Sequence, residues 1–177
     1  RLAYTYFMLH PGKKLLFMGQ DFAQLREWSE DRELDWYLLA EKPHQQIHDY
    51  MKELLHLYKK YPAMYELDHE WNGFEWINAD DKERSIYSFI RKSSDGKKCL
   101  VCVLNFTPVA RPDYRVGVPQ AGNYRLILNS DEERFGGQAA FESALSALLT
   151  EYEIDLIILA GFLTILSADF TARWPSR

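Results

Sequence analysis

The spacing of apolar residues changes several times along this 177-residue chain, and each change restricts the folds that it can adopt. A short continuous apolar run, Lys13 to Met18, is typical of a strand buried on both faces, as in a parallel sheet or barrel. Pro43 to Tyr61 then carries apolar residues three and four positions apart, which is the period of an amphipathic helix. From Phe74 the period becomes two, which indicates strands with one buried face. The order predicts an α/β unit followed by an all-β domain.

Several segments after Phe74 alternate apolar and polar residues over the length of a strand. Turn sequences such as Ser94-Asp95-Gly96 separate them. Short strands at this spacing are typical of an antiparallel sandwich, here with an incomplete sheet. The predicted strands are Phe74–Ile77, Ser85–Arg91, Lys98–Phe106, Tyr114–Val118 and Tyr124–Leu128.

The pattern changes again at Gly136-Gly137. An amphipathic helix from Phe141, a continuous apolar strand from Ile154 to Ala160 and a short helix from Ser167 to Arg173 then follow, as in a parallel α/β unit. One isolated unit supplies no neighbouring strands, so we expect this tail not to dock stably. The alternative is that Ile154–Ala160 pairs with the open edge of the β domain.

We therefore predict three parts, residues 1–65, 70–137 and 138–177, with a join of two unrelated sequences near Gly136-Gly137. The first residue is not Met, and the chain stops at Arg177 without a helix-stop signal, so we expect both ends to be cuts.

Composition argues against some classes of partner. The net charge of -5 does not suit a nucleic-acid binder, which carries a basic face. No apolar run approaches the roughly 18 residues of a membrane span, and no secretory signal opens the chain, so we expect a cytoplasmic protein. Aromatic residues make up 15%, which suits sugar stacking and a hydrophobic core equally. We expect no cofactor.

Three small motifs could suggest a metal, redox or modification site. Cys99 and Cys102 lie in an apolar strand, where residues three apart point to opposite faces, so we expect no shared metal. His44 and His48 are four apart on a helix, but no third ligand is near, and we expect surface or capping roles. Asn105 opens a glycosylation sequon, which we interpret as a strand end.

The loop from Gly19 to Trp36 is rich in carboxylates. General acid/base catalysis needs two carboxyl groups at a set separation, one with a pKa raised by burial. Nothing in the sequence indicates such burial, so we interpret the group as a solvated acidic loop rather than as proton-transfer residues. Its members are Asp21, Glu27, Glu30, Asp31, Glu33 and Asp35.

The segment HPGKKLLFMGQDFAQLREWSEDRELDWYLL, His10 to Leu39, resembles bacterial 1,4-α-glucan branching enzymes. The similarity continues in order and spacing through residue 137, for example in Gly73-Phe74-Glu75-Trp76-Ile77 and Asn105-Phe106-Thr107-Pro108. The resemblance implies that Leu15–Met18 is the eighth strand of a (β/α)8 barrel and that Gln20–Trp36 is the loop at its C-terminal face, where barrel active sites lie. Pro43–Tyr61 would be the last barrel helix, and Phe74 would begin the C-terminal β domain of α-amylase-type enzymes.

The resemblance also implies a reaction of glycogen biosynthesis. In that family a carboxylate attacks an α-1,4 bond, a second carboxylic acid protonates the leaving oxygen, and a glucan 6-hydroxyl accepts the chain. These carboxylates lie upstream of a segment like this one, so we expect the chain to be inactive alone and to bind α-glucan weakly. Five residues match the family motif after the eighth strand and imply a substrate rim: Gln20, Asp21, Gln24, Glu27 and Trp28. Asp21 stands where the family usually has Glu.

The tail, Phe141 to Arg177, resembles glycinamide ribonucleotide formyltransferase of purine biosynthesis. The similarity lies mainly in Tyr152, in Ile154–Leu163 and in Ile165-Leu166-Ser167. That family's catalytic Asn and His follow beyond this point. The backbone that lines its folate pocket corresponds to Leu163, Thr164, Ile165 and Leu166, with strand-end packing as the alternative.

Three interpretations remain open at this stage: a fragment of a branching enzyme, a β module that binds α-glucan without chemistry, and a chimeric reading frame without a function as a unit. A formyltransferase assignment would rest on the tail alone.

Overall fold

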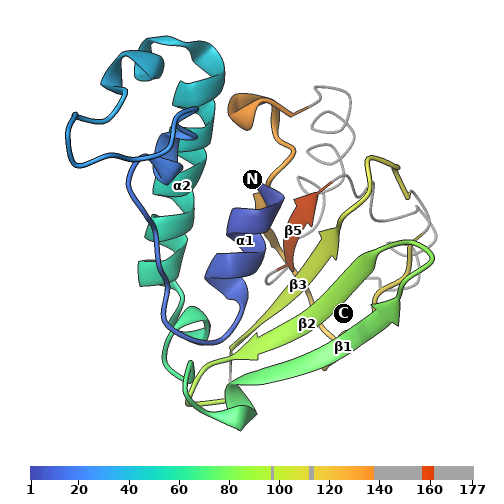
Figure 1. Cartoon of the computed structure of the whole chain (residues 1–177). Helices are drawn as coiled ribbons and strands as arrows, with labels where there is room; N and C mark the ends of the chain where they lie inside the picture. Colours follow the sequence, from blue (N-terminus) through green and yellow to red (C-terminus); the bar gives the residue numbers. More distant parts are fainter. Residues whose placement is uncertain (97, 112–113, 138–156, 162–177) are drawn as a thin grey trace.

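The computed structural model describes residues 1–96, 98–111, 114–137 and 157–161 of the chain. Two α-helices, α1 (Leu2–Leu9) and α2 (Lys42–Lys60), lie on one face of a β-sheet, as Figure 1 shows. α2 was predicted, and it begins and ends within a residue of its predicted limits. Pro43 lies in the first turn of α2, and Lys59 and Lys60 lie in the last turn, where positive charge complements the helix dipole. None of the helices in the described part of the chain is long and apolar enough to cross a membrane.

The sheet has five strands in the order β1-β2-β3-β5-β4. The first three, β1 (Phe74–Asp81), β2 (Ile86–Lys92) and β3 (Cys99–Asn105), form an antiparallel meander close to the predicted limits. β4 (Leu126–Asn129) lies at the far edge, and β5 (Ile157–Gly161) lies between β3 and β4, parallel to both. The antiparallel pairing of β1, β2 and β3 agrees with the prediction, whereas β5 and β4 add parallel pairs, so the described strands form one mixed sheet.

The position of β5 contradicts the expectation that the tail does not dock. Ile157 pairs with Val101 of β3 on one side and with Leu126 of β4 on the other. The prediction assumed that a parallel strand would find no neighbours, but β3 and β4 run in the same direction and supply a hydrogen-bonding edge on each side. The alternative, that this strand completes the β domain, agrees with the structure, although inside the sheet and not at its edge. Leu163, Thr164, Ile165 and Leu166 lie outside the described residues.

The main hydrophobic core lies between the sheet and the helices. Leu100, Cys102 and Leu104 of β3 point into it, and Val101 and Val103 point to the other face, as alternation requires. Helix residues that contribute to the main core include Met8, Leu9, Tyr50, Met51, Leu54 and Leu57.

A smaller cluster covers the opposite face of the sheet. Tyr114, Val116 and Val118 pack there, but the segment from Tyr114 to Val118 is not a strand, contrary to the prediction. Every second side chain of this segment packs on the sheet, which explains the alternation in the sequence. Such packing does not require the backbone to form a ladder of hydrogen bonds.

Lys13 to Met18 also forms no strand. The segment is extended, and Leu15, Leu16, Phe17 and Met18 expose between 38% and 72% of their surfaces. A strand buried on both faces needs neighbours on both edges, and the described part of the chain places none beside this segment. The predicted barrel strand is therefore not formed here, and the barrel as a whole is not shown.

Short 3-10 helices connect these elements: η1 (Gln20–Phe22), η2 (Trp36–Ala40), η3 (Pro62–Met64), η4 (Trp71–Gly73) and η5 (Glu133–Phe135).

One fully buried arginine joins three of these parts. Arg91 of β2 donates through Nη1 to the carbonyl of Leu9 at 2.5 Å, through Nε to the carbonyl of Gly73 at 3.3 Å and through Nη2 to the carboxylate of Asp68 at 2.5 Å. Burial of a guanidinium is costly unless it is paired and hydrogen-bonded, and here both conditions hold. Arg91 thus ties the end of α1 and the turn at η4 to the sheet.

Candidate functional site

The loop from Gly19 to Trp36 packs on the first half of α2 and begins with a tight turn. Gly19 has a φ of 77° and Ala23 a φ of 56°, both in the left-handed region. The amide of Gln24 donates to the carbonyl of Gly19 at 2.9 Å and closes the turn. A Cβ on Gly19 would lie 2.9 Å from Cβ of Gln24, so glycine is needed both for its φ and for this close approach.

Gln20 and Gln24 are bound within the loop by their own side chains. Oε1 of Gln20 accepts from the amide of Phe17 at 3.1 Å. Oε1 of Gln24 accepts from the amide of Asp35 at 2.8 Å, and its Nε2 donates to the carbonyl of Arg26 at 3.0 Å. Gln24 therefore clamps the two ends of the loop together. These two predicted rim residues shape the loop in this structure.

Asp35 was grouped with the solvated carboxylates, but its side chain is 3% exposed and forms two hydrogen bonds with Arg26. The Nε to Oδ2 distance is 2.9 Å. The hydrogen bonds from Arg26 hold the pKa of Asp35 below its usual range. Asp35 therefore stabilises the loop through its ion pair with Arg26 and does not act as a proton donor. No local pattern singled it out, because its partner lies on the other side of the loop.

Two histidines of α2 lie against the loop. Nδ1 of His44 lies 2.8 Å from the carbonyl oxygen of Phe22. Nδ1 of His48 lies 3.2 Å from Oδ2 of Asp21. Among the described residues no group of three His, Cys, Asp or Glu is placed to hold a metal ion. His44 therefore attaches the loop to α2 by a hydrogen bond, whereas Nδ1 of His48 lies beside Asp21 without hydrogen-bond geometry.

Glu27 and Trp28 form the outer part of the loop. Trp28 exposes 39% of its surface and packs edge to face on Phe17, with ring centroids 5.6 Å apart. The Glu27 side chain is exposed, and its carbonyl accepts from Arg32 at 2.6 Å. Of the predicted rim residues, Gln20, Glu27 and Trp28 are exposed, and Asp21 is half-buried beside His48.

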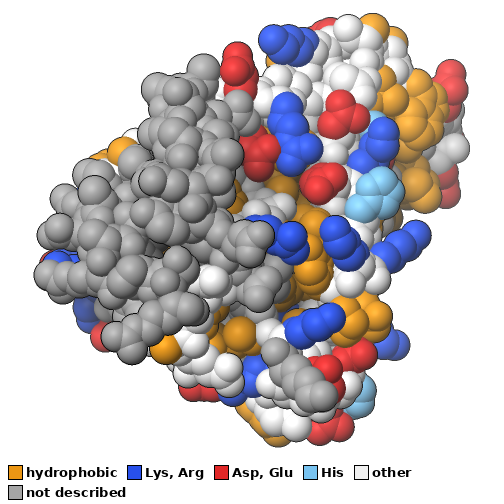
Figure 2. Space-filling view, turned by 180° about the vertical axis from the view of Figure 1, so that it is seen from behind, with side chains coloured by type: hydrophobic (Ala, Val, Ile, Leu, Met, Phe, Trp, Pro, Cys, Tyr) orange, Lys and Arg blue, Asp and Glu red, His pale blue; other side chains and the backbone are white. Residues whose placement is uncertain are grey.

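Exposed apolar side chains continue from this rim along the loop. Leu25 is 78% exposed, Trp36 51% and Tyr37 65%. Figure 2 shows hydrophobic side chains gathered at this end of the molecule with acidic side chains beside them. Exposed aromatic faces together with carboxylates can bind a ligand that offers both apolar faces and hydroxyl donors.

The remaining candidate residues have structural roles. Burial raises the pKa of the Cys102 thiol, and Cys99 lies on the opposite face of β3, so the two do not form a dithiol site. Asn105 is buried at the end of β3, where its Nδ2 donates to the carbonyl of Val109 at 2.9 Å. A sequon asparagine in this position is not presented for modification.

Comparison with known proteins places these features in a family context. Residues 76–151 match the family described as alpha amylase, C-terminal all-beta domain. This match runs past Gly137, where we predicted the β domain to end, and the comparisons give no support to the formyltransferase resemblance.

Similar proteins are named 1,4-alpha-glucan branching enzyme GlgB. The protein from Butyrivibrio fibrisolvens is 57% identical over 140 residues, which is 79% of this chain and 22% of that protein. The protein from Bacillus cereus strain G9842 is 46% identical over 153 residues, 86% of this chain and 24% of that protein. The chain therefore spans about a fifth to a quarter of the length of these relatives, and the similarities support a relation to their C-terminal part.

Proposed function

We propose that this chain is the C-terminal part of a 1,4-alpha-glucan branching enzyme, which transfers a segment of α-1,4-glucan to a 6-hydroxyl in glycogen biosynthesis. The observation that carries the proposal is the 57% identity to the Butyrivibrio fibrisolvens enzyme over 140 residues. The match of residues 76–151 to the alpha amylase C-terminal all-beta domain supports the same assignment.

In this proposal the loop from Gly19 to Trp36 forms one rim of the glucan site. Gln24 and the Arg26–Asp35 ion pair hold the loop in shape. Trp28 then offers an aromatic face to a sugar ring, and Asp21 and Glu27 accept hydrogen bonds from sugar hydroxyls. The exposed run Leu15–Met18 pairs with strands of the same barrel in the longer enzyme, which explains an apolar segment without a strand partner among the described residues.

The chemistry belongs to groups outside this chain. Glycosyl transfer with retention needs a carboxylate nucleophile and a carboxylic acid that protonates the leaving oxygen, about 5–5.5 Å apart. The one carboxyl of the loop that is buried, Asp35, is held ionised by Arg26 and cannot act as that acid. The 177-residue chain alone is therefore expected to show no branching activity with amylose, measured by iodine staining. Branching by the purified chain would contradict this assignment of roles.

A hybrid enzyme tests the proposal directly. Residues 1–137 of this chain replace the matching segment of the Butyrivibrio fibrisolvens enzyme, and branching of amylose is followed by iodine staining. We expect the hybrid to branch, because the loop, α2 and the β domain of this chain then stand in for their counterparts. The unaltered Butyrivibrio enzyme is the positive control. A folded hybrid that binds amylose but does not branch it would count against the proposal.

The second candidate is a module that binds α-glucan without chemistry. The exposed aromatic side chains Trp28, Trp36 and Tyr37 favour it, because such faces stack on sugar rings in the absence of any catalytic group. Retardation of the isolated chain in a native gel that contains amylose, together with an inactive hybrid, is the result that would favour this candidate over the first.

A further inference from the structure

Trp71 exposes 99% of its surface to solvent. It lies in η4, where the chain passes from the helical part into β1. A fully exposed indole gains no burial energy in the folded chain, so stability does not explain its presence. Large exposed apolar side chains beside polar groups are typical of interaction sites.

The turn that carries Trp71 is fixed. The amide of Gly73 donates to the carbonyl of Glu70 at 3.2 Å, and the carbonyl of Gly73 accepts from the buried Arg91 at 3.3 Å. A Cβ on Gly73 would lie 2.4 Å from Cβ of Leu67, so this turn admits only glycine without rearrangement. The indole is therefore presented from a rigid backbone, which reduces the ordering cost of binding.

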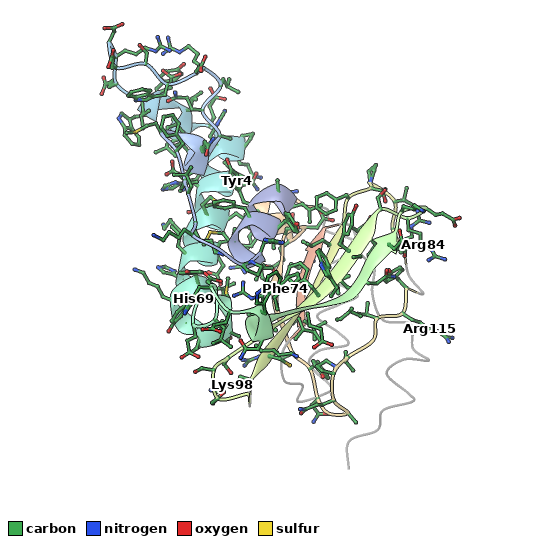
Figure 3. All side chains as sticks on the ribbon, turned by 60° about the horizontal axis from the view of Figure 1, so that its bottom comes forward. Tyr4, His69, Phe74, Arg84, Lys98 and Arg115 are labelled. Carbon is green, nitrogen blue, oxygen red and sulfur yellow. The ribbon has the colours of Figure 1, made fainter. Side chains whose placement is uncertain are left out.

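A hollow of about 610 Å³ adjoins Trp71, a size within the roughly 300–1,000 Å³ of small-molecule sites. Phe74 and Trp76 of β1 line it with aromatic surface, their rings 5.0 Å apart and nearly perpendicular. Trp76 is supported in turn by the buried Phe89, with ring centroids 5.6 Å apart. Figure 3 labels Phe74 and His69, which lie where the helical part meets β1.

Five polar side chains border the same hollow: His10, Asp68, His69, Glu70 and Glu75. Asp68 pairs with Arg91 and Glu75 pairs with Lys92, which leaves Glu70 as the bordering carboxylate without a Lys or Arg partner among the ion pairs described. His69, Glu70 and Glu75 expose 78%, 52% and 57% of their side chains, and the His69 Nε2 lies 3.6 Å from Glu70 Oε1. The carboxylates accept hydrogen bonds, and the imidazole can donate or accept one. Because the bordering carboxylates repel phosphates and carboxylates, the hollow suits a neutral ligand rich in hydroxyl donors.

We propose that this hollow binds a chain of α-1,4-glucan, with the indole of Trp71 against a sugar face and Glu70 and Glu75 accepting from sugar hydroxyls. The inference rests on the proposed function, which supplies α-glucan as the substrate class. The site is separate from the loop rim, because the rim packs on the first half of α2 and the hollow lies past its other end. The 19 residues of α2 span about 28 Å. A long glucan held at both places is retained better than at either alone.

The test uses the 177-residue chain, with retardation in native gels that contain amylose and a fluorescence titration with maltoheptaose. The change Trp71→Ala is expected to weaken binding about tenfold, equivalent to roughly 1.4 kcal/mol. Its thermal midpoint should match the unaltered chain, because the removed side chain is exposed. Leu55→Ala, which removes an exposed apolar side chain of α2 that does not line the hollow, should bind amylose like the unaltered chain. Cellohexaose, a β-1,4 glucan, is the ligand control.

Two results would overturn the proposal. One is unchanged binding of amylose and maltoheptaose by Trp71→Ala. The other is a Trp71 that is shielded from acrylamide quenching in the hybrid enzyme without glucan, which would mean that another part of the polypeptide covers the hollow. The branching assay separates this inference from the proposed function. If the hybrid branches amylose and Trp71→Ala binds glucan normally, the glucan site at the hollow is rejected and the proposed function stands. If the hybrid is inactive and glucan affinity depends on Trp71, the branching function is rejected and the glucan site stands.

Discussion

Arg91 shows how a single residue can hold together parts of a chain that are far apart in sequence. From a position near the end of β2, its guanidinium reaches α1, the turn at η4 and the carboxylate of Asp68. Because the Trp71 hollow begins at that turn, the geometry of the proposed glucan site depends on a residue that no ligand touches.

Replacement of Arg91 by methionine should lower the free energy of unfolding by about 3–5 kcal/mol, because it leaves buried partners without their donor. Urea unfolding followed by circular dichroism measures the change. Lys92→Met is the matched control, since Lys92 is half-exposed and pairs with an exposed Glu75, a contact of about 0–1 kcal/mol. Equal stability of the two variants would show that Arg91 does not hold the parts together as described.

Asp35 gives the loop a dependence on pH. Its pKa is lower in the folded chain than the ordinary value of about 3.9. A carboxyl of this kind contributes stability above its unfolded pKa and loses the contribution as the pH falls through the folded pKa. The change Asp35→Asn should therefore destabilise the loop at pH 7 and flatten the loss of stability below about pH 4. Urea midpoints between pH 7 and pH 2.5 test this, with the exposed Asp31→Asn as control. Parallel profiles for Asp35→Asn and the unaltered chain would contradict it.

At the scale of elements, α2 organises the molecule. One side of the helix closes the main core through Tyr50, Met51, Leu54 and Leu57. Its first half contacts the loop and holds it by the hydrogen bond of His44 to the carbonyl of Phe22. Leu54 and Leu55 both belong to the apolar positions of Pro43–Tyr61, and that pattern predicts that both face the core. Leu54 is 1% exposed, but Leu55 is 42% exposed, so the prediction for Leu55 is wrong. Adjacent residues on a helix are about 100° apart, so a buried Leu54 does not require a buried Leu55.

This difference gives a sharp test of the packing. Leu54→Asp places a charge in the apolar core and should cost several kcal/mol, lowering the thermal midpoint substantially. Leu55→Asp makes the same chemical change one residue further on and should leave the midpoint within a few degrees, since surface changes are usually worth about 0.5 kcal/mol or less. Thermal unfolding by circular dichroism compares the two. Similar midpoints for both variants would mean that α2 is rotated from the position described.

Periodicity located those elements whose partners are local. α2, β1, β2 and β3 were all predicted, because an amphipathic helix and a hairpin meander carry their own pattern and neighbours in sequence. Lys13–Met18 and Tyr114–Val118 form no strands in this structure, because strand formation depends on a hydrogen-bonding edge that the segment itself does not encode. The same limit applied to the loop. The motif predicts a substrate rim, which stays a prediction, but the Arg26–Asp35 pair and the contacts of Gln24 across the loop are not visible in any local pattern.

On the scale of the whole molecule, the sheet depends on one short strand. In the described residues β4 is bonded only to β5, and β5 is bonded to β3. The antiparallel part β1-β2-β3 is continuous without them. The sheet therefore has two parts: the meander β1-β2-β3, whose strands are neighbours in sequence, and the pair β5-β4, in which β4 depends on a segment far from it in sequence.

Truncation after Gly137 should affect β4 and leave the meander β1-β2-β3 intact. Without β5, the amides of Leu126 and Leu128 in β4 should lose protection from hydrogen exchange, while those of Phe89 and Cys102 remain protected by the meander. In the unaltered chain the amides of Ile157–Gly161 should exchange slowly. Fast exchange of Ile157–Gly161 in the full chain would restore the expectation that the tail does not dock, as would rapid proteolysis after Arg134.

The position of β5 also has a consequence for biosynthesis. A ribosome makes β3 and β4 first, and the strand that joins them emerges last. At roughly 5–20 residues per second, about 2–6 s pass between the synthesis of Asn129 and that of Gly161. During this interval the edge of β3 and both edges of β4 are open to any extended peptide, including another nascent copy of the same chain. Crowded polysomes and fast initiation should therefore lower the yield of this polypeptide, and slower synthesis should raise it.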